Sequence, residues 1–348
     1  MGVVILIKKY FMAIVLLSLC LTLFSCSLND EGDTEKNLGT ESVVTTTASS
    51  EKQEEKNKSD SEDELYDSTA VSEAYMKGSD SGLDDLQKAI YEKASQIISE
   101  NISDSMTDYE KELAIHDYLI SHCTYDDSHL LVFERHGKNA VDPYGTLIEG
   151  KAICSGYTST FQMFMDMLKI PCKSIKATDK SGQDHAWNMV ELGGEWYYVD
   201  VTWDDPIPDC DGRLISHSYF NVTEEFMKQE HKWKNDEYPK ADSIEYSYGN
   251  QSIKNVDDIS KVEKLLENAV DKMSDTLYIE FDKKLNIDIS KLNKTSDGDD
   301  VEKAVPGLNN VVEKFQDKND CLVVYYPEKI GTKSIMEFEI MKIDETTK

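Results

Sequence analysis

Three segments in the first half of the chain carry apolar residues at the spacing of an amphipathic helix. They cover residues 83–97, 107–120 and 154–168. Thr107 and Glu110 have the spacing of a capping box, so we expect the second helix to begin there. The apolar face of the third segment consists of Tyr157, Phe161, Phe164, Met165 and Leu168.

Two runs rich in tryptophan, tyrosine and valine follow, at residues 185–192 and 195–203. Gly193 and Gly194 separate the runs, and a Gly-Gly pair in this position is typical of a tight β-hairpin. The sequence therefore predicts two antiparallel strands joined by a two-residue turn.

The register of this hairpin decides which side chains can meet. A two-residue turn makes Leu192 face Glu195, and it places His185 and Asp200 as diagonal neighbours on one sheet face. Their backbones would then lie roughly 7–8 Å apart, within side-chain reach. A slip of one residue would put them on opposite faces. Asn188 points to the other face, so we expect no catalytic role for it.

Beyond Pro239 the pattern changes to a mixture of short helices and strands, which predicts a small α+β part without a catalytic constellation. Its expected elements are helices at 259–273 and 308–315 and strands at 277–281, 321–326 and 335–343.

The first 25 residues have the pattern of a signal peptide. Lys8 and Lys9 precede an apolar run at residues 10–24, which is too short for a transmembrane helix. The run ends in Leu-Phe-Ser-Cys, which resembles a bacterial lipoprotein box with the lipid on Cys26. An ordinary secretory signal with a chance cysteine is the alternative. The expected location is extracytoplasmic, with the chain anchored to a bacterial cell membrane.

Composition separates the rest of the chain into three parts. Residues 26–80 are polar and acidic with few large apolar side chains, which predicts a disordered tether. We expect a catalytic domain at 81–242 and an accessory domain at 243–348.

The formal net charge of −30 argues against nucleic acid as a partner, because phosphates require a basic surface.

A cysteine, a histidine and an aspartate provide the candidate chemistry. Cys154 begins the third predicted helix, where unpaired backbone N–H groups favour a thiolate and could bind an oxyanion. His185 would act as general base, and Asp200 would orient it. Taken singly, each of these residues could instead be a core residue or a turn residue. Taken together, with the cysteine at the start of a helix and the other two on a hairpin, they indicate a catalytic triad.

The motifs around these residues resemble a known family. They are G-K-A-I-C-S-G-Y at 150–157, H-A-W-N at 185–188 and W-Y-Y-V-D-V-T-W-D at 196–204. This stretch is similar to the transglutaminase-like superfamily, a branch of the papain-like cysteine enzymes, and particularly to its secreted bacterial members. The resemblance covers residues 83–240 and includes the order Cys, His, Asp.

The resemblance implies an α+β fold, in which a helical N-terminal part with the nucleophile at a helix start packs on an antiparallel sheet. The thioester chemistry considered below requires no metal and no organic cofactor. Tyr144 stands where the family often has an aromatic hydroxyl, which would either donate to the oxyanion or pack against the nucleophile helix. Trp187 would pack in the core, shield the His–Asp pair, or do both.

Other polar residues receive less specific interpretations. We expect His116 to be a buried or half-buried packing residue rather than a catalyst, and Asp204 and Asp205 to be turn residues. The histidines near Cys123 match no common zinc spacing, and a solvated loop is the preferred interpretation; they are His122, His129 and His136. Export permits disulfides, but the sequence leaves the pairing of the remaining cysteines open; they are Cys123, Cys172, Cys210 and Cys321.

The expected chemistry is acyl transfer through a thioester on Cys154. With water as acceptor the chain would be a peptidase or amidase acting on a protein or peptide, for example a cell-wall peptide. With an amine as acceptor it would be a cross-linking transglutaminase. A non-catalytic cell-surface binding protein is the third alternative.

Overall fold

The computed structural model describes residues 65–127, 139–205, 215–234, 237–272, 274–319 and 321–342. The predicted signal peptide, the lipidation site Cys26 and the residues His129, His136 and Cys210 lie outside these ranges. The chain divides into two compact units, residues 1–62 and 63–348, and the description below concerns the second. In the described part, none of the helices combines the length and the apolar character that crossing a membrane requires.

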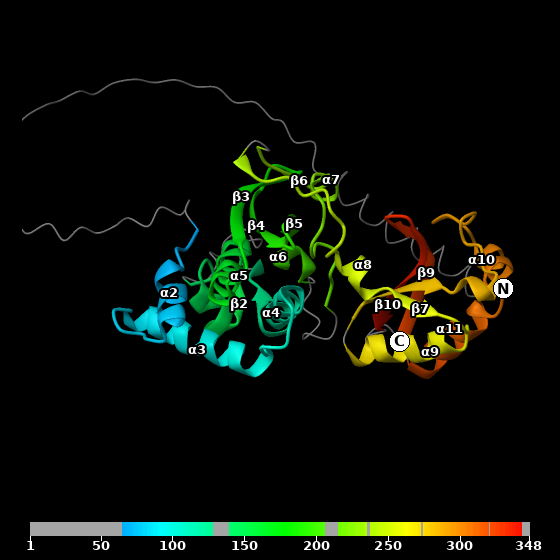
Figure 1. Cartoon of the computed structure of the whole chain (residues 1–348), viewed down its shortest axis with the longest axis horizontal. Coiled ribbons are helices and arrows are strands. Elements are labelled where there is room, and N and C mark those ends of the chain that lie inside the picture. Colours follow the sequence, from blue (N-terminus) through cyan, green and yellow to red (C-terminus); the bar gives the residue numbers. More distant parts are fainter. Residues whose placement is uncertain are drawn as a thin grey trace, which may run out of the picture. The chain divides into compact units, whose positions relative to one another are not determined.

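Helices enclose one side of the first hydrophobic core, which contains Ile90, Ile115, Phe161 and Phe164. The helices predicted from the apolar spacing are confirmed, and the capping box of Thr107 and Glu110 is present. These helices are α3 (Asp85–Asn101), α4 (Asp108–His122) and α5 (Cys154–Leu168) (Figure 1).

An antiparallel sheet with the strand order β5-β4-β3-β6 closes the other side of this core. Helix α5 packs against β3 and β4 (Figure 1), so the start of α5 lies close to the histidine-bearing strand. The strands are β3 (Cys172–Asp179), β4 (Asp184–Leu192), β5 (Glu195–Val199) and β6 (His231–Lys232). The α+β fold expected from the sequence is confirmed.

The predicted hairpin register is confirmed from Leu192 opposite Glu195 to Asn188 opposite Val199. Both turn glycines have positive φ angles, 61° at Gly193 and 88° at Gly194, which side chains rarely permit. The ladder ends earlier than we predicted. After Val199 the chain enters the short helix α6 (Val201–Asp204), so the second strand does not extend to residue 203.

The predicted end of the disordered tether at residue 80 is wrong. Residues 69–77 form helix α2 (Thr69–Lys77), and its Val71 is fully buried in the first core. The apolar face of α2 is narrow and stands among polar residues, so composition alone concealed it.

Short elements complete the region around α5. Strand β1 (Thr124–Tyr125) pairs in parallel with β2 (Lys151–Ala152), directly before α5. The π-helix η2 (Gly145–Glu149) precedes β2, and α7 (Glu224–Met227) precedes β6.

The C-terminal part has its own core and a sheet with the strand order β7-β8-β10-β9. Helices α9 and α11 lie side by side against this sheet (Figure 1). Its elements are α8 (Tyr248–Ser252), β7 (Lys254–Val256), α9 (Lys261–Asp271), β8 (Thr276–Phe281), η4 (Lys283–Leu285), α10 (Gly298–Ala304), α11 (Leu308–Asn319), β9 (Cys321–Ile330) and β10 (Lys333–Lys342). The predicted mixture of helices and strands is therefore confirmed.

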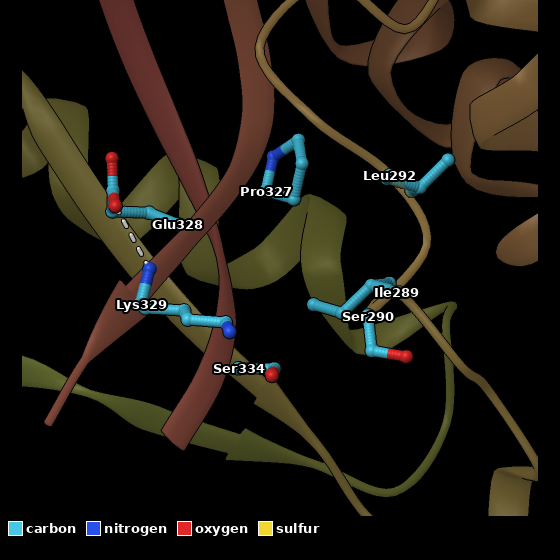
Figure 2. Close-up of a pocket in the computed structure, with 7 residues that line it drawn as sticks. All are labelled: Ile289, Ser290, Leu292, Pro327, Glu328, Lys329 and Ser334. Carbon is cyan, nitrogen blue, oxygen red and sulfur yellow. Dashed lines mark hydrogen bonds between the residues drawn. The ribbon is translucent and has the colours of Figure 1, made fainter. Parts of the chain in front are cut away.

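Figure 2 shows a small pocket of this C-terminal part, between β9 and the segment that follows η4. Its lining contains no cysteine and no histidine, so it offers no second nucleophile–base pair. The lining residues are Ile289, Ser290, Leu292, Pro327, Glu328, Lys329 and Ser334.

Candidate active site

Cys154 is the first residue of α5, as the apolar spacing predicted. The residue before it, Ile153, caps the helix without a side-chain hydrogen bond. The Gly156 N–H donates to the Ile153 carbonyl at 2.9 Å, whereas the N–H groups of Cys154 and Ser155 can stabilise negative charge at the thiol or on a bound oxyanion.

The close approach of neighbouring backbone explains why Gly156 stands in this first turn. A Cβ atom at Gly156 would lie 2.4 Å from the Ala140 carbonyl oxygen and 2.9 Å from the Ala152 Cβ. The backbone therefore packs directly on the segment around Ala140 and on β2, which fixes the position of Cys154 relative to them.

His185 and Asp200 are in direct contact, as the hairpin register predicted. The His185 Nε2–H donates to Asp200 Oδ2 over 2.6 Å. The other carboxylate oxygen, Oδ1, accepts from the Trp203 backbone N–H at 3.1 Å, so Asp200 also caps helix α6. Both side chains are buried, and the Asp200 carboxylate is completely inaccessible to solvent.

Burial and charge act against each other at this pair. Burial alone would lower the pKa of His185, but attraction to Asp200 and the contacts of the Cys154 thiol raise it to about 10. Burial alone would raise the pKa of Asp200, but His185 and a second histidine lower it to about 2. A protonated imidazole beside an ionised carboxylate is therefore the stable state at neutral pH.

The thiol and the carboxylate act on the same imidazole. The Cys154 thiol lies near enough to His185 to raise the pKa of the imidazole together with Asp200. Because Asp200 occupies Nε2, Nδ1 is the ring nitrogen left for the thiol. The structure thus brings together the three residues that the sequence singled out.

Sequence reasoning missed His231, which contacts the same carboxylate. Its Nε2–H donates to Asp200 Oδ2 over 2.9 Å, beside the bond from His185. His231 follows Asp200 by 31 residues and lies in a two-residue strand, so no periodic pattern marks it. Its place within the tryptophan-rich block was the available signal.

Aromatic rings surround the two histidines. The ring of Trp187 lies 5.8 Å from His185 and 4.8 Å from His231, and the ring of Trp203 lies 5.4 Å and 4.2 Å from them. Trp187 is almost fully buried. Both expected roles of Trp187, packing and shielding of the pair, agree with this position.

Tyr125 is a further residue that sequence reasoning missed. Burial and the nearby negative charges of Cys154 and of Asp126 and Asp200 raise the pKa of its hydroxyl. A neutral hydroxyl close to Cys154 can donate a hydrogen bond. Its strand, β1, has only two residues, which explains why no strand pattern was visible.

Tyr144 and Asn188 hold structural positions. The Tyr144 side chain is partly buried against the first core, and its backbone N–H donates to Asp142 Oδ1. The Asn188 amide donates to the Thr158 carbonyl at 3.2 Å, on the α5 side of the sheet. Asn188 therefore faces away from His185, as the register predicted.

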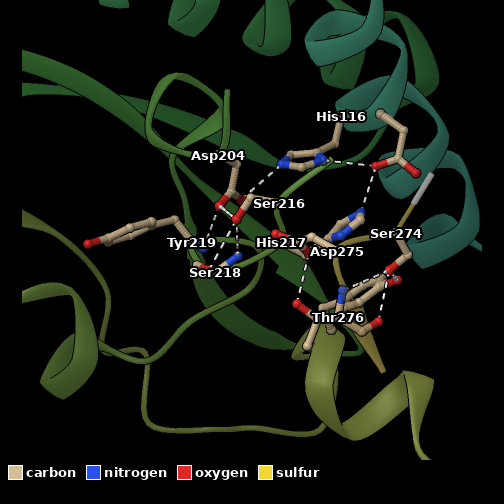
Figure 3. A network of polar contacts seen from close by, with 11 residues as sticks. His116, Asp204, Ser216, His217, Ser218, Tyr219, Ser274, Asp275 and Thr276 are labelled. Atoms are coloured by element: carbon tan, nitrogen blue, oxygen red, sulfur yellow. Dashed lines mark hydrogen bonds and ion pairs between the residues drawn. The ribbon is translucent and has the colours of Figure 1, made fainter. Parts of the chain in front are cut away.

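Figure 3 shows a second histidine–carboxylate network, which includes His116, His217 and Asp204. His116 is completely buried, and its Nε2 bonds to Asp204 Oδ2 at 3.1 Å while its Nδ1 bonds to Asp117 Oδ1 at 3.0 Å. His217 donates to the same Asp117 oxygen at 2.9 Å. Burial would lower the pKa of His116, but the two carboxylates raise it to about 9.

These contacts correct three interpretations from the sequence. His116 is buried as expected, but it is a charged partner rather than a packing residue. Asp204 is a fully buried member of α6 that also accepts from Ser216 Oγ and the Tyr219 N–H. Asp205 is buried and accepts from the Tyr157 hydroxyl. The prediction of turn residues missed these partners because they are distant in sequence.

Two groups in the described part have ligand atoms close enough to hold a metal ion, His116–Asp117–His217 and His185–Asp200–His231. In both groups each histidine nitrogen that faces the carboxylate is within hydrogen-bond distance of it. Hydrogen bonds therefore account for both arrangements without an ion.

Comparison with known proteins agrees with this geometry. Residues 96–201 match the Transglutaminase-like superfamily. The chain carries a transglutaminase-like domain. The match includes Cys154, His185 and Asp200 and ends before His231. This superfamily contains cysteine peptidases and transglutaminases, and an enzymatic role is consistent with the match.

Curated relatives resemble the transglutaminase-like domain over part of their length. Human Kyphoscoliosis peptidase is 29% identical over 125 residues, which are 33% of this chain and 18% of the relative. The mouse protein of the same name is 27% identical over 126 residues, 33% of this chain and 19% of the relative. The chain thus matches about a fifth of the length of these relatives.

Solved structures resemble the chain over a similar share. A TGase is 20% identical, with 37% of each chain covered and a TM-score of 0.31. A candidate cysteine protease from Cytophaga hutchinsonii is 16% identical, with 34% of this chain and 39% of that chain covered and a TM-score of 0.27.

Proposed function

We propose that the protein is a cysteine acyl-transfer enzyme that hydrolyses peptide or amide bonds through a thioester on Cys154. The observation that carries the proposal is the His185 imidazole, which donates to the buried Asp200 carboxylate and interacts electrostatically with the Cys154 thiol. This arrangement can hold a thiolate–imidazolium pair ready for attack on a carbonyl.

In the first step the Cys154 thiolate attacks the carbonyl carbon of an amide, and the carbonyl oxygen becomes an oxyanion near the first turn of α5. The tetrahedral intermediate collapses, the C–N bond breaks, and the leaving amine takes the proton from His185. A thioester remains on Cys154. Asp200 keeps the imidazole in the required orientation throughout.

In the second step water attacks the thioester, and His185 accepts a proton from that water. The C–S bond then breaks, a carboxylic acid is released, and the thiolate–imidazolium pair is restored. No redox partner is needed. We prefer water to an amine as acceptor because the curated relatives are named as peptidases.

Amine transfer is the second candidate, since the superfamily is named for it. The same thioester would then react with a lysine or another primary amine to give a cross-linked product. A binding protein without turnover is the third. The contact of all three polar groups argues for catalysis, because a binding surface has no need of a buried His–Asp pair behind a cysteine.

We also propose that the enzyme acts at a cell surface, with Cys26 as the lipid-bearing residue and a protein or cell-wall peptide as substrate. The support is the sequence pattern of residues 1–26. Metabolic labelling with a fatty-acid analogue tests it: Cys26→Ala should abolish lipid incorporation, whereas Cys20→Ala should leave it unchanged after signal cleavage.

The central test is alkylation of the full chain by iodoacetamide between pH 4 and 9, followed by peptide mapping. We expect Cys154 to react at pH values well below the ordinary thiol pKa, and His185→Ala to remove this reactivity. Burial raises the pKa of the Cys172 thiol, so that residue is an internal control that should stay unmodified at acidic pH.

His122 provides a matched control for the histidine substitution, because its side chain is exposed and bonds to the Tyr118 carbonyl. His122→Ala should leave the alkylation profile unchanged. If Cys154 titrates as an ordinary thiol in the folded wild-type chain, the enzymatic proposal is wrong. A peptide library with and without a labelled amine then separates hydrolysis from amine transfer.

A further inference from the structure

We propose that His231 is a positioning residue of this site, which holds the Asp200 carboxylate from a second side so that Asp200 orients the His185 imidazole. The inference rests on the proposed function. It extends the site beyond the three residues that the sequence predicted and beyond the end of the family match at residue 201.

The geometry gives Asp200 three donors from three elements. His185 on β4 and His231 on β6 donate to Oδ2 at 2.6 and 2.9 Å, and the Trp203 N–H in α6 donates to Oδ1 at 3.1 Å. Two donors to one oxygen restrict rotation of the carboxylate about its bond to Cβ. Without His231, Asp200 Oδ2 would be held by His185 alone.

His231 is itself held firmly. It is 1% exposed, and its backbone pairs with Asp179 of β3, next to the strand that carries His185. The Trp203 and Tyr219 rings pack against its imidazole with centroids 4.2 and 5.6 Å away. A rigid donor is required of a residue that positions another group.

The tautomer of His231 follows from its contacts. A carboxylate accepts hydrogen bonds, so Nε2 carries the proton. The Nδ1 atom is buried and has no hydrogen-bond partner. His231 is therefore a fixed donor to Asp200 and not a second general base.

The effect of His231 on Asp200 depends on the other titratable groups around this carboxylate. The groups that interact with the carboxylate are His185 on β4, Tyr125 on β1 and Tyr219. Cys154 of α5 acts on it through His185. The two histidines are the groups that favour its ionised form. Loss of the His231 donor leaves Asp200 ionised at neutral pH but free to turn away from His185.

The experiment measures the second-order rate of Cys154 alkylation by iodoacetamide in the full chain from pH 5 to 9. His231→Phe keeps a ring and removes the donor, whereas His231→Gln restores an N–H that can reach the carboxylate. We expect His231→Phe to lower the rate at pH 6 about tenfold, the effect of losing one charge-assisted hydrogen bond. Its profile should move toward that of an ordinary thiol, and His231→Gln should return it most of the way.

Two results would overturn the inference. One is a wild-type pH profile in His231→Phe, even if that variant melts at a lower temperature, because this outcome describes a purely structural residue. The other is an equal loss in His231→Gln and His231→Phe. If His231→Phe does not fold, His231→Asn, with its shorter reach, is compared with His231→Gln in its place.

The same data separate this inference from the proposed function. If wild-type Cys154 is activated and His185→Ala abolishes the activation, the function stands whatever His231 does. If wild-type Cys154 is not activated at all, the function itself is wrong and the role of His231 is rejected with it.

Discussion

Asp200 and Asp204 stand at the two ends of one four-residue helix, and each carboxylate holds a different histidine. Asp200 caps the start of α6 and contacts His185, whereas Asp204 ends the helix and contacts His116. The Asp204 N–H also donates to the Asp200 carbonyl at 3.1 Å. A single helical turn therefore joins the candidate active site to a second buried ionic network.

Loss of the Asp204 charge should destabilise the fold. Asp204→Asn leaves the buried His116 with only the partly exposed Asp117 as a charged partner, so we expect the free energy of unfolding to fall by about 3–5 kcal/mol. Urea unfolding measures this. Asp184→Asn is the control, because Asp184 is exposed, and it should change stability by about 0.5 kcal/mol at most. Equal stability of the two variants would contradict the importance of this network.

Stability should fall in alkaline solution. The pKa values of His185 and His116 are raised to about 10 and about 9, above the ordinary histidine value of 6.5. Their contribution is therefore complete below pH 6.5 and is lost as the pH rises toward 10. Urea unfolding between pH 6 and 10 checks this. Asp204→Asn should reduce the part of the decline that comes from His116.

Stability should also fall in acid, because the carboxyl pKa values are lowered on folding, whereas the histidine pKa values are raised. The pKa values of Asp200 and Asp117 are lowered to about 2, below the ordinary value of 3.8. Their contribution is complete above pH 3.8 and is lost as the pH falls toward 2. A stability curve without a maximum between pH 4 and 6.5 would show that these ion pairs do not govern the fold.

A methyl group at Gly156 should be costly. The added Cβ would meet the Ala140 carbonyl oxygen at 2.4 Å, and backbone cannot move away as a side chain can. We expect Gly156→Ala to lower the free energy of unfolding by about 1–3 kcal/mol or more. Gly249→Ala is the matched control, because the nearest atom to its Cβ would be the flexible tip of the Ile330 side chain at 2.8 Å, and the Tyr278 ring would lie at an ordinary 3.5 Å. Similar losses in both variants would be inconsistent with the packing described.

Asn188 should prove structural and not catalytic. Its buried amide donates to the Thr158 carbonyl and to Ser174 Oγ, which joins α5 to the sheet. Asn188→Ala should lower stability by about 1–3 kcal/mol because these acceptors lose their donor. The pH profile of Cys154 alkylation in the folded variant should stay as in wild type. A shifted profile would place Asn188 in the catalytic machinery.

The sequence was sufficient for the parts of the site that local pattern determines. The apolar spacing of residues 154–168 located the helix that begins at Cys154, and the Gly-Gly turn fixed the hairpin register as far as Val199, the residue before Asp200. The register failed beyond Val199, because Asp200 caps a helix there. A capping side chain and a strand residue have the same sequence neighbours, and only tertiary packing decides between them.

Contacts between distant segments could not be predicted in this way. His231, Asp204 and His116 each have a buried partner that lies between 31 and 88 residues away. No spacing rule links such residues, and a lone buried histidine is usually read as packing. Helix α2 was missed for a different reason: Val71 lies in a stretch whose composition is otherwise that of a solvated tether.

The tryptophan residues around the candidate site allow its state to be followed by intrinsic fluorescence. Trp187 and Trp203 stack near His185, and the Trp233 ring lies 5.7 Å from that of Trp187, so three of the four indoles share one neighbourhood. A protonated imidazole quenches indole emission more strongly than a neutral one. Intrinsic fluorescence should therefore brighten as His185 loses its proton, and it should respond when an acyl group occupies Cys154, without any added dye.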